Sequence, residues 1–135
     1  MKSEYSIISS AGAAYTRESE KKGHMIHPRC FGAFPRFLGK YVKNEQLMDW
    51  EEAIYKISGG PAKKLGLKDR GVIKKNNWAD IVLLNPRNII DNATFENPYQ
   101  YPSGIEYVLV NGKITIKNGK HTGAQAGSVL RHSTA

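Results

Sequence analysis

The side chains with the greatest capacity for chemistry in this sequence lie close together, beside two prolines. His27 and Arg29 flank one proline, Cys30 follows directly, and Arg36 comes after the second proline. An arginine guanidinium is a planar fork of donors that can bind a carboxylate through two hydrogen bonds. Residue type therefore makes Arg29 and Arg36 candidate carboxylate-binding residues, with a structural or surface role as the alternative. For Cys30, the sequence favours an inert buried cysteine over a nucleophile activated by its basic neighbour.

The histidines form no recognised catalytic or metal-binding pattern. The sequence contains no His-x-His pair, no His-Glu-x-x-His, no Cys-x-x-Cys and no phosphate-binding glycine loop. We expect His24 and His132 to be exposed in loops, and His121 to lie in a turn. The residues by themselves thus assign no catalytic group and no metal ligand, and we expect no cofactor in this chain.

Charge and composition limit the classes of partner. The chain has 135 residues and a net charge of +8, but its 20 Lys and Arg residues are scattered rather than clustered. A solvated surface accounts for such a distribution better than a nucleic-acid interface does. No apolar run approaches the roughly 20 residues of a membrane helix, and no secretory signal is evident. The single cysteine excludes an internal disulfide, so we expect a cytoplasmic protein without nucleic-acid or membrane partners.

Strand signals concentrate in the second half of the chain. Asn111-Gly112 lies between two apolar, β-branched runs, which predicts a hairpin with a type I′ turn. Asn118-Gly119 predicts a second turn at the end of the return strand. The continuous apolar run Ile81–Leu84 predicts a strand covered on both faces, and Val72-Ile73 and Tyr5–Ile8 are further strand candidates. A hairpin and one strand cannot close a sheet, so we expect these strands to need partners from outside the chain.

Helix signals concentrate before those strands. Apolar residues at three- and four-residue spacing predict one amphipathic helix over 35–44, opened by Pro35, and a second over 50–58, capped by Asp49. Gly59-Gly60 is expected to end the second helix, and Pro61 to open a short third helix over 61–65. The predicted buried stripes are Phe34, Phe37, Leu38, Tyr41 and Val42 in the first helix and Trp50, Ala53, Ile54 and Ile57 in the second.

The order of these elements predicts an α+β fold in which the helices are segregated from the strands. We divide the chain into a loop-rich segment over 1–26, a helical segment over 27–70, strands and hairpin over 71–123, and a tail over 124–135. The long loop over 86–104 contains three aromatic residues and is expected to be packed down by their rings.

Several segments together resemble the N-acyl-D-amino-acid deacylases, or D-aminoacylases, of the amidohydrolase superfamily. The resemblance covers the chain from about residue 26 to 131. The strand pattern after Gly71 is typical of the superfamily, and shorter segments narrow the resemblance to the D-aminoacylases. These segments are His27-Pro28-Arg29, Phe34-Pro35-Arg36-Phe37-Leu38-Gly39-Lys40-Tyr41-Val42, Leu65-Gly66-Leu67-Lys68-Asp69-Arg70-Gly71, Gln100-Tyr101-Pro102 and His121-Thr122-Gly123.

The resemblance implies a fold and a reaction. The chain would contain the last helices of an incomplete (β/α)8 barrel, followed by strands of the small β-sandwich of these enzymes, whose other strands come from the missing N-terminal part. The family hydrolyses N-acyl-D-amino acids, with zinc activating water and ligands that lie mostly upstream. The family's general-base aspartate lies in a Ser-Asp-Gly-like context, and here either Ser10 or Ala11 takes its place. The resemblance further implies that Arg29 binds the substrate carboxylate, with His27 nearby.

Two hypotheses of different class follow. In the first, the chain is a C-terminal fragment or truncated homologue of a zinc-dependent deacylase, and is inactive without the rest of the enzyme. In the second, it is a non-enzymatic module that self-associates or binds a partner protein through open strand edges. Ile81–Leu84 and Ile105–Ile116 are the expected edges for such a homo-oligomer.

Overall fold

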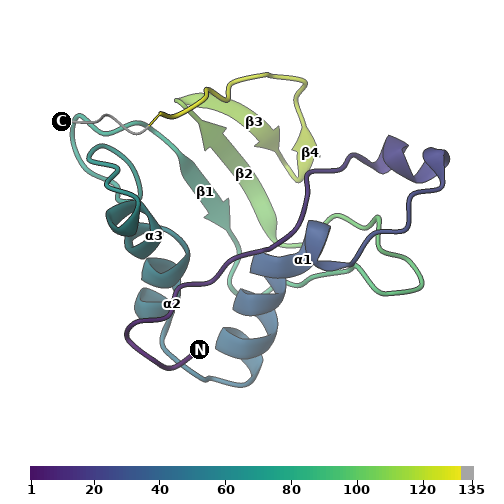
Figure 1. The fold of residues 1–135 in the computed structure, drawn as a ribbon, viewed down its shortest axis with the longest axis horizontal. Coiled ribbons are helices and arrows are strands. Elements are labelled where there is room, and N and C mark those ends of the chain that lie inside the picture. The colour runs from purple at the N-terminus through teal and green to yellow at the C-terminus, as the bar shows by residue number, and fades with distance from the viewer. Residues whose placement is uncertain (132–135) are drawn as a thin grey trace.

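A computed structural model describes residues 1–131, apart from the side chains of residues 21 and 22 (Figure 1). His132 and the end of the predicted tail lie outside the described residues. The helical elements are η1 (Arg17–Lys22), α1 (Arg29–Arg36), η2 (Phe37–Asn44), α2 (Trp50–Ile57) and α3 (Gly59–Lys64). The strands are β1 (Ile81–Leu84), β2 (Ile105–Val110), β3 (Lys113–Lys117) and β4 (Lys120–His121).

The strands form an antiparallel sheet in the order β1-β2-β3-β4. Asn111 and Gly112 connect β2 to β3 with φ angles of 49° and 78°, so the predicted type I′ turn is confirmed. Asn118 and Gly119 make the second predicted turn, with φ angles of 50° and 72°. The combination of helices and an antiparallel sheet confirms the mixed α and β composition expected from the sequence (Figure 1).

Two strand candidates and part of one expected edge are wrong. Tyr5–Ile8 and Val72-Ile73 form no strand. The part of Ile105–Ile116 that forms β2 has no open edge, because β2 is hydrogen-bonded to β1 on one side and to β3 on the other. Val82 and Leu83 of β1 are 54% and 52% exposed within the described residues, so the prediction of a strand covered on both faces stays a prediction.

The first predicted helix is longer than its sequence signal. Helix α1 begins at Arg29, so Pro35 lies inside it instead of opening it. Pro28 takes the N-cap position with a helical backbone, at φ −51° and ψ −28°, and starts the helix one turn and a half early. A proline inside a helix removes one backbone donor, and the chain continues after Pro35 as the π-helical element η2.

Helix α2 begins where its capping signal predicted. The Asp49 carboxylate accepts a hydrogen bond from the Glu52 backbone N–H at 2.8 Å, which satisfies one of the unpaired donors of the first turn. The helix ends at Ile57, but Gly59 and Gly60 begin α3 and do not simply stop the chain.

The buried stripe of α2 differs from the prediction at two positions. Ala53 is buried as predicted, whereas Ile54 is 39% exposed and Lys56 is 2% exposed. The Lys56 ammonium is tolerated there because its Nζ donates to the Ser3 carbonyl at 2.7 Å and lies 3.4 Å from the Glu52 carboxylate. The N-terminal segment thus supplies the acceptor that a buried lysine needs.

The core cluster joins the helices to the sheet. Its buried members are Phe37, Leu38, Val42, Ala53 and Ile89. Ile8, Leu84 and Ile105 pack against this cluster from the N-terminal segment and from two strands. Tyr41 is half-buried and packs against this cluster, whereas Phe34, which was predicted to be buried, is exposed. The predicted divisions over 1–26, 27–70 and 71–123 therefore all contribute residues to one core.

A glycine sets the distance between η2 and the segment after β1. A Cβ placed on Gly39 would lie 2.5 Å from the Ile89 carbonyl oxygen, closer than real Cβ contacts. Ile89 has 0% exposure, so this backbone segment has little room to move away.

We predict that Gly39→Ala destabilises the fold by about 1–3 kcal/mol, because the new methyl overpacks against the Ile89 backbone. Helix propensity alone would give the opposite sign, a gain of roughly 1 kcal/mol. Urea denaturation of the purified chain measures the difference. Gly127→Ala is the control, since a Cβ at Gly127 meets no atom within 4 Å. A stability of Gly39→Ala equal to or above that of the unmodified chain contradicts the packing argument.

Candidate substrate-binding surface

The start of α1 fixes the backbone of the predicted substrate-binding pair. The His27 Nδ1 accepts a hydrogen bond at 3.0 Å from the Arg29 backbone N–H, the first orphan donor of the helix. Because this nitrogen is an acceptor, the neutral imidazole carries its proton on Nε2. Pro28 restrains φ between the two residues. His27 and Arg29 are therefore brought together by a local turn that leaves both side chains exposed.

Aromatic rings hold the long loop against this turn. The His27 ring packs edge-on against Phe95, with centroids 5.1 Å apart and planes at 77°. One turn along α1, Phe31 contacts Tyr99 and Tyr101, at 5.7 and 5.3 Å between centroids. The expectation that rings pack the loop down is confirmed for Tyr99, which is 3% exposed, while Phe95 remains mostly exposed.

Tyr99 ties the loop to a third segment. Its hydroxyl donates to the His24 carbonyl at 2.8 Å. Burial raises the pKa of the Tyr99 phenol, and the nearby Tyr15 and Glu20 add to the shift because their negative charges oppose a phenolate. Tyr99 thus stays protonated as a hydrogen-bond donor at neutral pH.

The two candidate arginines have different environments. The Arg36 guanidinium donates to the Asp91 carboxylate at 3.2 Å, and this hydrogen bond and charge raise the pKa of Arg36. Arg36 therefore serves the structure, joining α1 to the start of the long loop. The Arg29 guanidinium, in contrast, has no hydrogen-bond or ion-pair partner among the described residues.

The N-terminal loop passes close to Arg29. A Cβ placed on Gly12 would lie 3.1 Å from the Cys30 Cα, which places the Ser9–Gly12 loop against the first turn of α1. The hydroxyls of Ser9 and Ser10 accept from the backbone N–H groups of the residues two further on. Ala11, which follows Ser10, has a φ of 46°, a left-handed conformation that is uncommon for alanine.

The other candidate residues lie elsewhere. His24 is exposed as expected. The expectation of a turn at His121 is wrong, because His121 lies in β4, where its Nδ1 accepts a hydrogen bond from the Gly123 backbone N–H at 2.9 Å. Cys30 is half-buried and free. An open groove of about 550 Å³ at the end of η2 contains neither His27 nor Arg29; its lining residues are Val42, Lys43, Gln46, Met48, Asp49, Trp50, Pro86 and Arg87.

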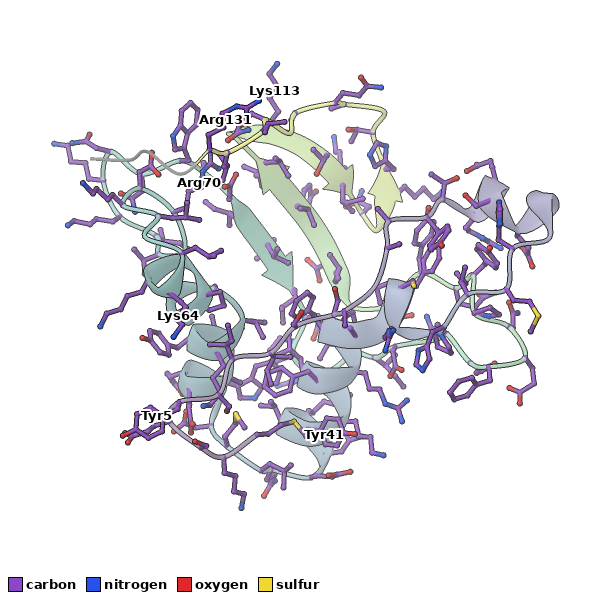
Figure 2. The ribbon with its side chains drawn as sticks, viewed as in Figure 1. Tyr5, Tyr41, Lys64, Arg70, Lys113 and Arg131 are labelled. Carbon is purple, nitrogen blue, oxygen red and sulfur yellow. The ribbon has the colours of Figure 1, made fainter. Side chains whose placement is uncertain are left out.

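The strongest polar network of the sheet is also distant from Arg29 along the fold. Arg70 pairs with Asp80 and donates to the Asn111 side chain at 2.7 Å, and it lies at the end of the sheet beside the β2–β3 turn (Figure 2). Asp80 in turn accepts from the Asn111 backbone at 2.7 Å. These contacts are mutually satisfied, so the network orders the turn and leaves no free group for a ligand.

The described residues do not fit a zinc ion. Within residues 1–131, no three His, Cys, Asp or Glu side chains gather as a set of metal ligands. No helix in that part of the chain has the length and apolar character needed to cross a bilayer.

Sequence comparison defines the class of protein. The amidohydrolase family profile matches residues 8–116, so the chain belongs to the amidohydrolase family. The match begins earlier than the resemblance read from the sequence, and it includes the Ser9–Gly12 loop. D-aminoacylase of Alcaligenes xylosoxydans xylosoxydans is 39% identical over 109 residues, which are 81% of this chain and 22% of that protein.

Solved structures agree with this assignment. A crystal structure of D-aminoacylase superposes with a TM-score of 0.78 at 40% identity, over 80% of this chain and 23% of its own. N-acyl-D-glutamate deacylase from Bordetella bronchiseptica, crystallised with zinc and a phosphonate mimic of the tetrahedral intermediate, superposes with a TM-score of 0.67. It is 40% identical over 67% of this chain and 19% of its own. The chain spans about a fifth of the length of these relatives.

We predict that ionisation of Tyr99 lowers the free energy of unfolding at alkaline pH. Its pKa is higher in the folded state than the ordinary value of 10.0, so folding is favoured below that value and this contribution is lost as pH rises through the folded pKa. Urea denaturation between about pH 8 and 11 should show the unfolding free energy falling less steeply in Tyr99→Phe than in the unmodified chain. Tyr5→Phe, at an 89% exposed residue, should keep the original slope. If the unfolding free energy falls equally steeply with pH in all three proteins, the pKa of Tyr99 is not raised by folding.

Proposed function

We propose that this chain is the C-terminal part of a D-aminoacylase-like hydrolase, in which Arg29 binds the α-carboxylate of an N-acyl-D-amino acid. The helices α1 to α3 belong to the end of a (β/α)8 barrel, and β1 to β4 to a small β-sandwich completed by the rest of the enzyme. His27 fixes the Arg29 backbone and lies beside the bound carboxylate. The similarity to D-aminoacylase over most of this chain supports the substrate class.

The observation that carries the role of Arg29 is its unpaired guanidinium. The residue is exposed, and no acceptor among the described residues binds its side chain. The other candidate arginine, Arg36, is already paired with Asp91. A guanidinium free to make a bidentate contact is the natural receptor for a carboxylate. The hydrogen bond to His27 fixes the backbone from which the Arg29 side chain extends, which reduces the conformational entropy lost on binding.

The position of the missing general base supports the same location. Ser10, Ala11 and Gly12 match a Ser-Asp-Gly pattern with alanine at the place of the aspartate. The left-handed φ of Ala11 favours this residue over Ser10, because Asp and Asn adopt that conformation more readily than other side chains do. The Gly12 contact with Cys30 sets this position beside the residue that follows Arg29. A general base at position 11 and the Arg29 guanidinium would thus both lie beside the same bound substrate.

The rest of the enzyme must supply the metal. The described residues form no set of three metal ligands, so in this proposal the chain contributes substrate binding and the rest of the enzyme contributes most of the zinc ligands. We therefore expect the purified chain with added zinc to hydrolyse no N-acetyl-D-methionine.

We predict that Ala11→Asp restores catalysis when the chain is placed in a complete enzyme. In a chimera, residues 8–116 replace the aligned segment of Alcaligenes D-aminoacylase, so the zinc ligands are present. The Ala11→Asp chimera should hydrolyse N-acetyl-D-methionine about 10²–10⁴ times faster than the unmodified chimera, the usual contribution of a general base. Steady-state kinetics measure the difference.

Ser10→Asp is the matched control, since it places a carboxylate one residue away. It should leave the chimera as slow as before. Recovery by Ser10→Asp assigns the base position to Ser10. If both variants stay inactive with normal zinc content and normal melting temperature, the base assignment is wrong.

We predict that Arg29→Lys in the Ala11→Asp chimera raises KM for N-acetyl-D-methionine by about ten- to a hundredfold. Lysine keeps the charge but loses the fork, and a charge-assisted hydrogen bond contributes roughly 1.5–3 kcal/mol. The corresponding substrate amide, which lacks the carboxylate, should be bound equally by both enzymes. Comparison of KM for acid and amide makes the measurement specific.

Arg36→Lys is the control for this experiment. It weakens the pair with Asp91, so we expect a lower melting temperature and no change in the preference for acid over amide. If Arg29→Lys changes both substrates equally, Arg29 has a structural role.

A further inference from the structure

Two turns of the sheet contain the same three residues in different surroundings. Asn111-Gly112-Lys113 leads from β2 into β3, and Asn118-Gly119-Lys120 leads from β3 into β4, so the turns lie at opposite ends of β3 (Figure 1). An asparagine before glycine is prone to lose its side-chain amide, because glycine has no Cβ to hinder attack by its own backbone nitrogen. Since the residues of the two turns are identical, a difference in their reactivity must come from what surrounds them.

The Asn111 side chain is held at both of its polar atoms. Its Oδ1 accepts a hydrogen bond from the Arg70 guanidinium at 2.7 Å, and its Nδ2 donates to the Ala126 carbonyl at 2.7 Å. The Gly112 backbone N–H donates to the Ala79 carbonyl at 3.0 Å. Attack of the Gly112 nitrogen on the Asn111 side chain therefore requires these partners to be released, including a charge-assisted hydrogen bond.

The Asn118 side chain is exposed and makes no hydrogen bond to any described residue. Asn118 and Gly119 line an open groove of about 450 Å³, which gives water access to the turn. The Gly119 backbone N–H donates to the Glu106 carbonyl at 3.3 Å, a longer bond than that of Gly112. Strand β4, which follows, has only the two residues Lys120–His121, so the turn can open locally at low cost.

We propose that Asn118 is a site of spontaneous deamidation in the folded protein, and that the contacts of Asn111 protect it from the same reaction. The Gly119 backbone nitrogen loses its proton to hydroxide and attacks Asn118 Cγ, so that a new N–Cγ bond closes a succinimide ring. The Cγ–Nδ2 bond breaks, and the amide nitrogen takes a proton from water and leaves as ammonia. One water molecule then opens the ring at either carbonyl, which gives aspartate or isoaspartate.

The two products have different effects on the hairpin. Each adds a carboxylate at position 118 and lowers the net charge of +8 by one unit. Aspartate fits the turn, because Asp tolerates the positive φ of 50° that Asn118 has. Isoaspartate inserts an additional carbon atom into the backbone, so the register in which Lys117 lies opposite Lys120 cannot be kept. We therefore expect the isoaspartate form to lose β4.

Peptide mapping by mass spectrometry tests the proposal on the full chain of 135 residues. During incubation of the folded chain at mildly alkaline pH, aspartate and isoaspartate should accumulate at position 118. Conversion at position 111 should be slower by about tenfold or more, since a charge-assisted hydrogen bond must first open. In the same buffer with enough urea to unfold the chain, the two sites should react at similar rates, which isolates the contribution of the structure.

A substitution and a matched control examine the protection of Asn111. Arg70→Met removes the donor to Asn111 Oδ1 and should raise the rate at position 111 about tenfold or more, without changing the rate at position 118. Lys68→Met removes an exposed positive charge from the same segment and should leave both rates unchanged. Circular dichroism reports whether each variant stays folded.

Three outcomes overturn the proposal. The first is an equal rate at the two sites in the folded chain, and the second is a folded chain that stays unmodified at position 118. The third is an Arg70→Met variant that keeps its circular dichroism spectrum and reacts at position 111 as slowly as the unmodified chain. If Arg70→Met unfolds, the comparison of the two sites in the unmodified chain still decides the question.

Discussion

The close contact between Gly39 and the Ile89 backbone is the constraint on which the rest of this structure depends. It brings η2 against the segment after β1, and the Lys43 ammonium strengthens the junction by donating to the Ile89 carbonyl at 3.1 Å. Two residues further on, Asp91 pairs with Arg36. The start of the long loop is thereby fixed along the helix, and the aromatic rings that follow reach the first turn of α1. The position of the long loop against α1 is therefore a consequence of this packing, whereas the pairing of His27 with Arg29 is local.

Side chains around Ile89 are buried and their polar groups have hydrogen-bond partners, whereas part of β1 is exposed. Around Ile89 the apolar side chains are buried, and even the Lys56 ammonium finds carbonyl and carboxylate acceptors. In β1, Leu84 packs against this cluster, whereas Val82 and Leu83 are more than half exposed. Hydrophobic stabilisation is roughly proportional to the apolar area removed from water, so the core around Ile89 contributes more to stability than these two positions do.

Much of the fold could be predicted because its signals are local. The Asn111-Gly112 turn and the Asp49 cap each depend on neighbours within a few residues, and both lie where the sequence placed them. The failures involve distant partners. Periodicity marked Ile54 as buried, but Lys56 is buried in that helix because the N-terminal segment supplies its acceptors. The predicted strand at Val72-Ile73 is absent, and the sheet of the described residues contains only β1 to β4.

Distant partners also limit what the sequence predicts about the candidate site. Residue type made Arg29 and Arg36 equivalent candidates, and family resemblance favoured Arg29. In the structure the two arginines differ, because a carboxylate 55 residues further along the chain binds Arg36, whereas Arg29 has no partner among the described residues. Likewise, the sequence left Ser10 and Ala11 as alternatives, and of the two only Ala11 has a positive φ. A non-glycine residue with a positive φ carries a cost in backbone strain, whereas the exposed Arg29 guanidinium is solvated and carries none. Neither feature is visible in residue types or spacing, because both depend on how distant segments pack around the start of α1.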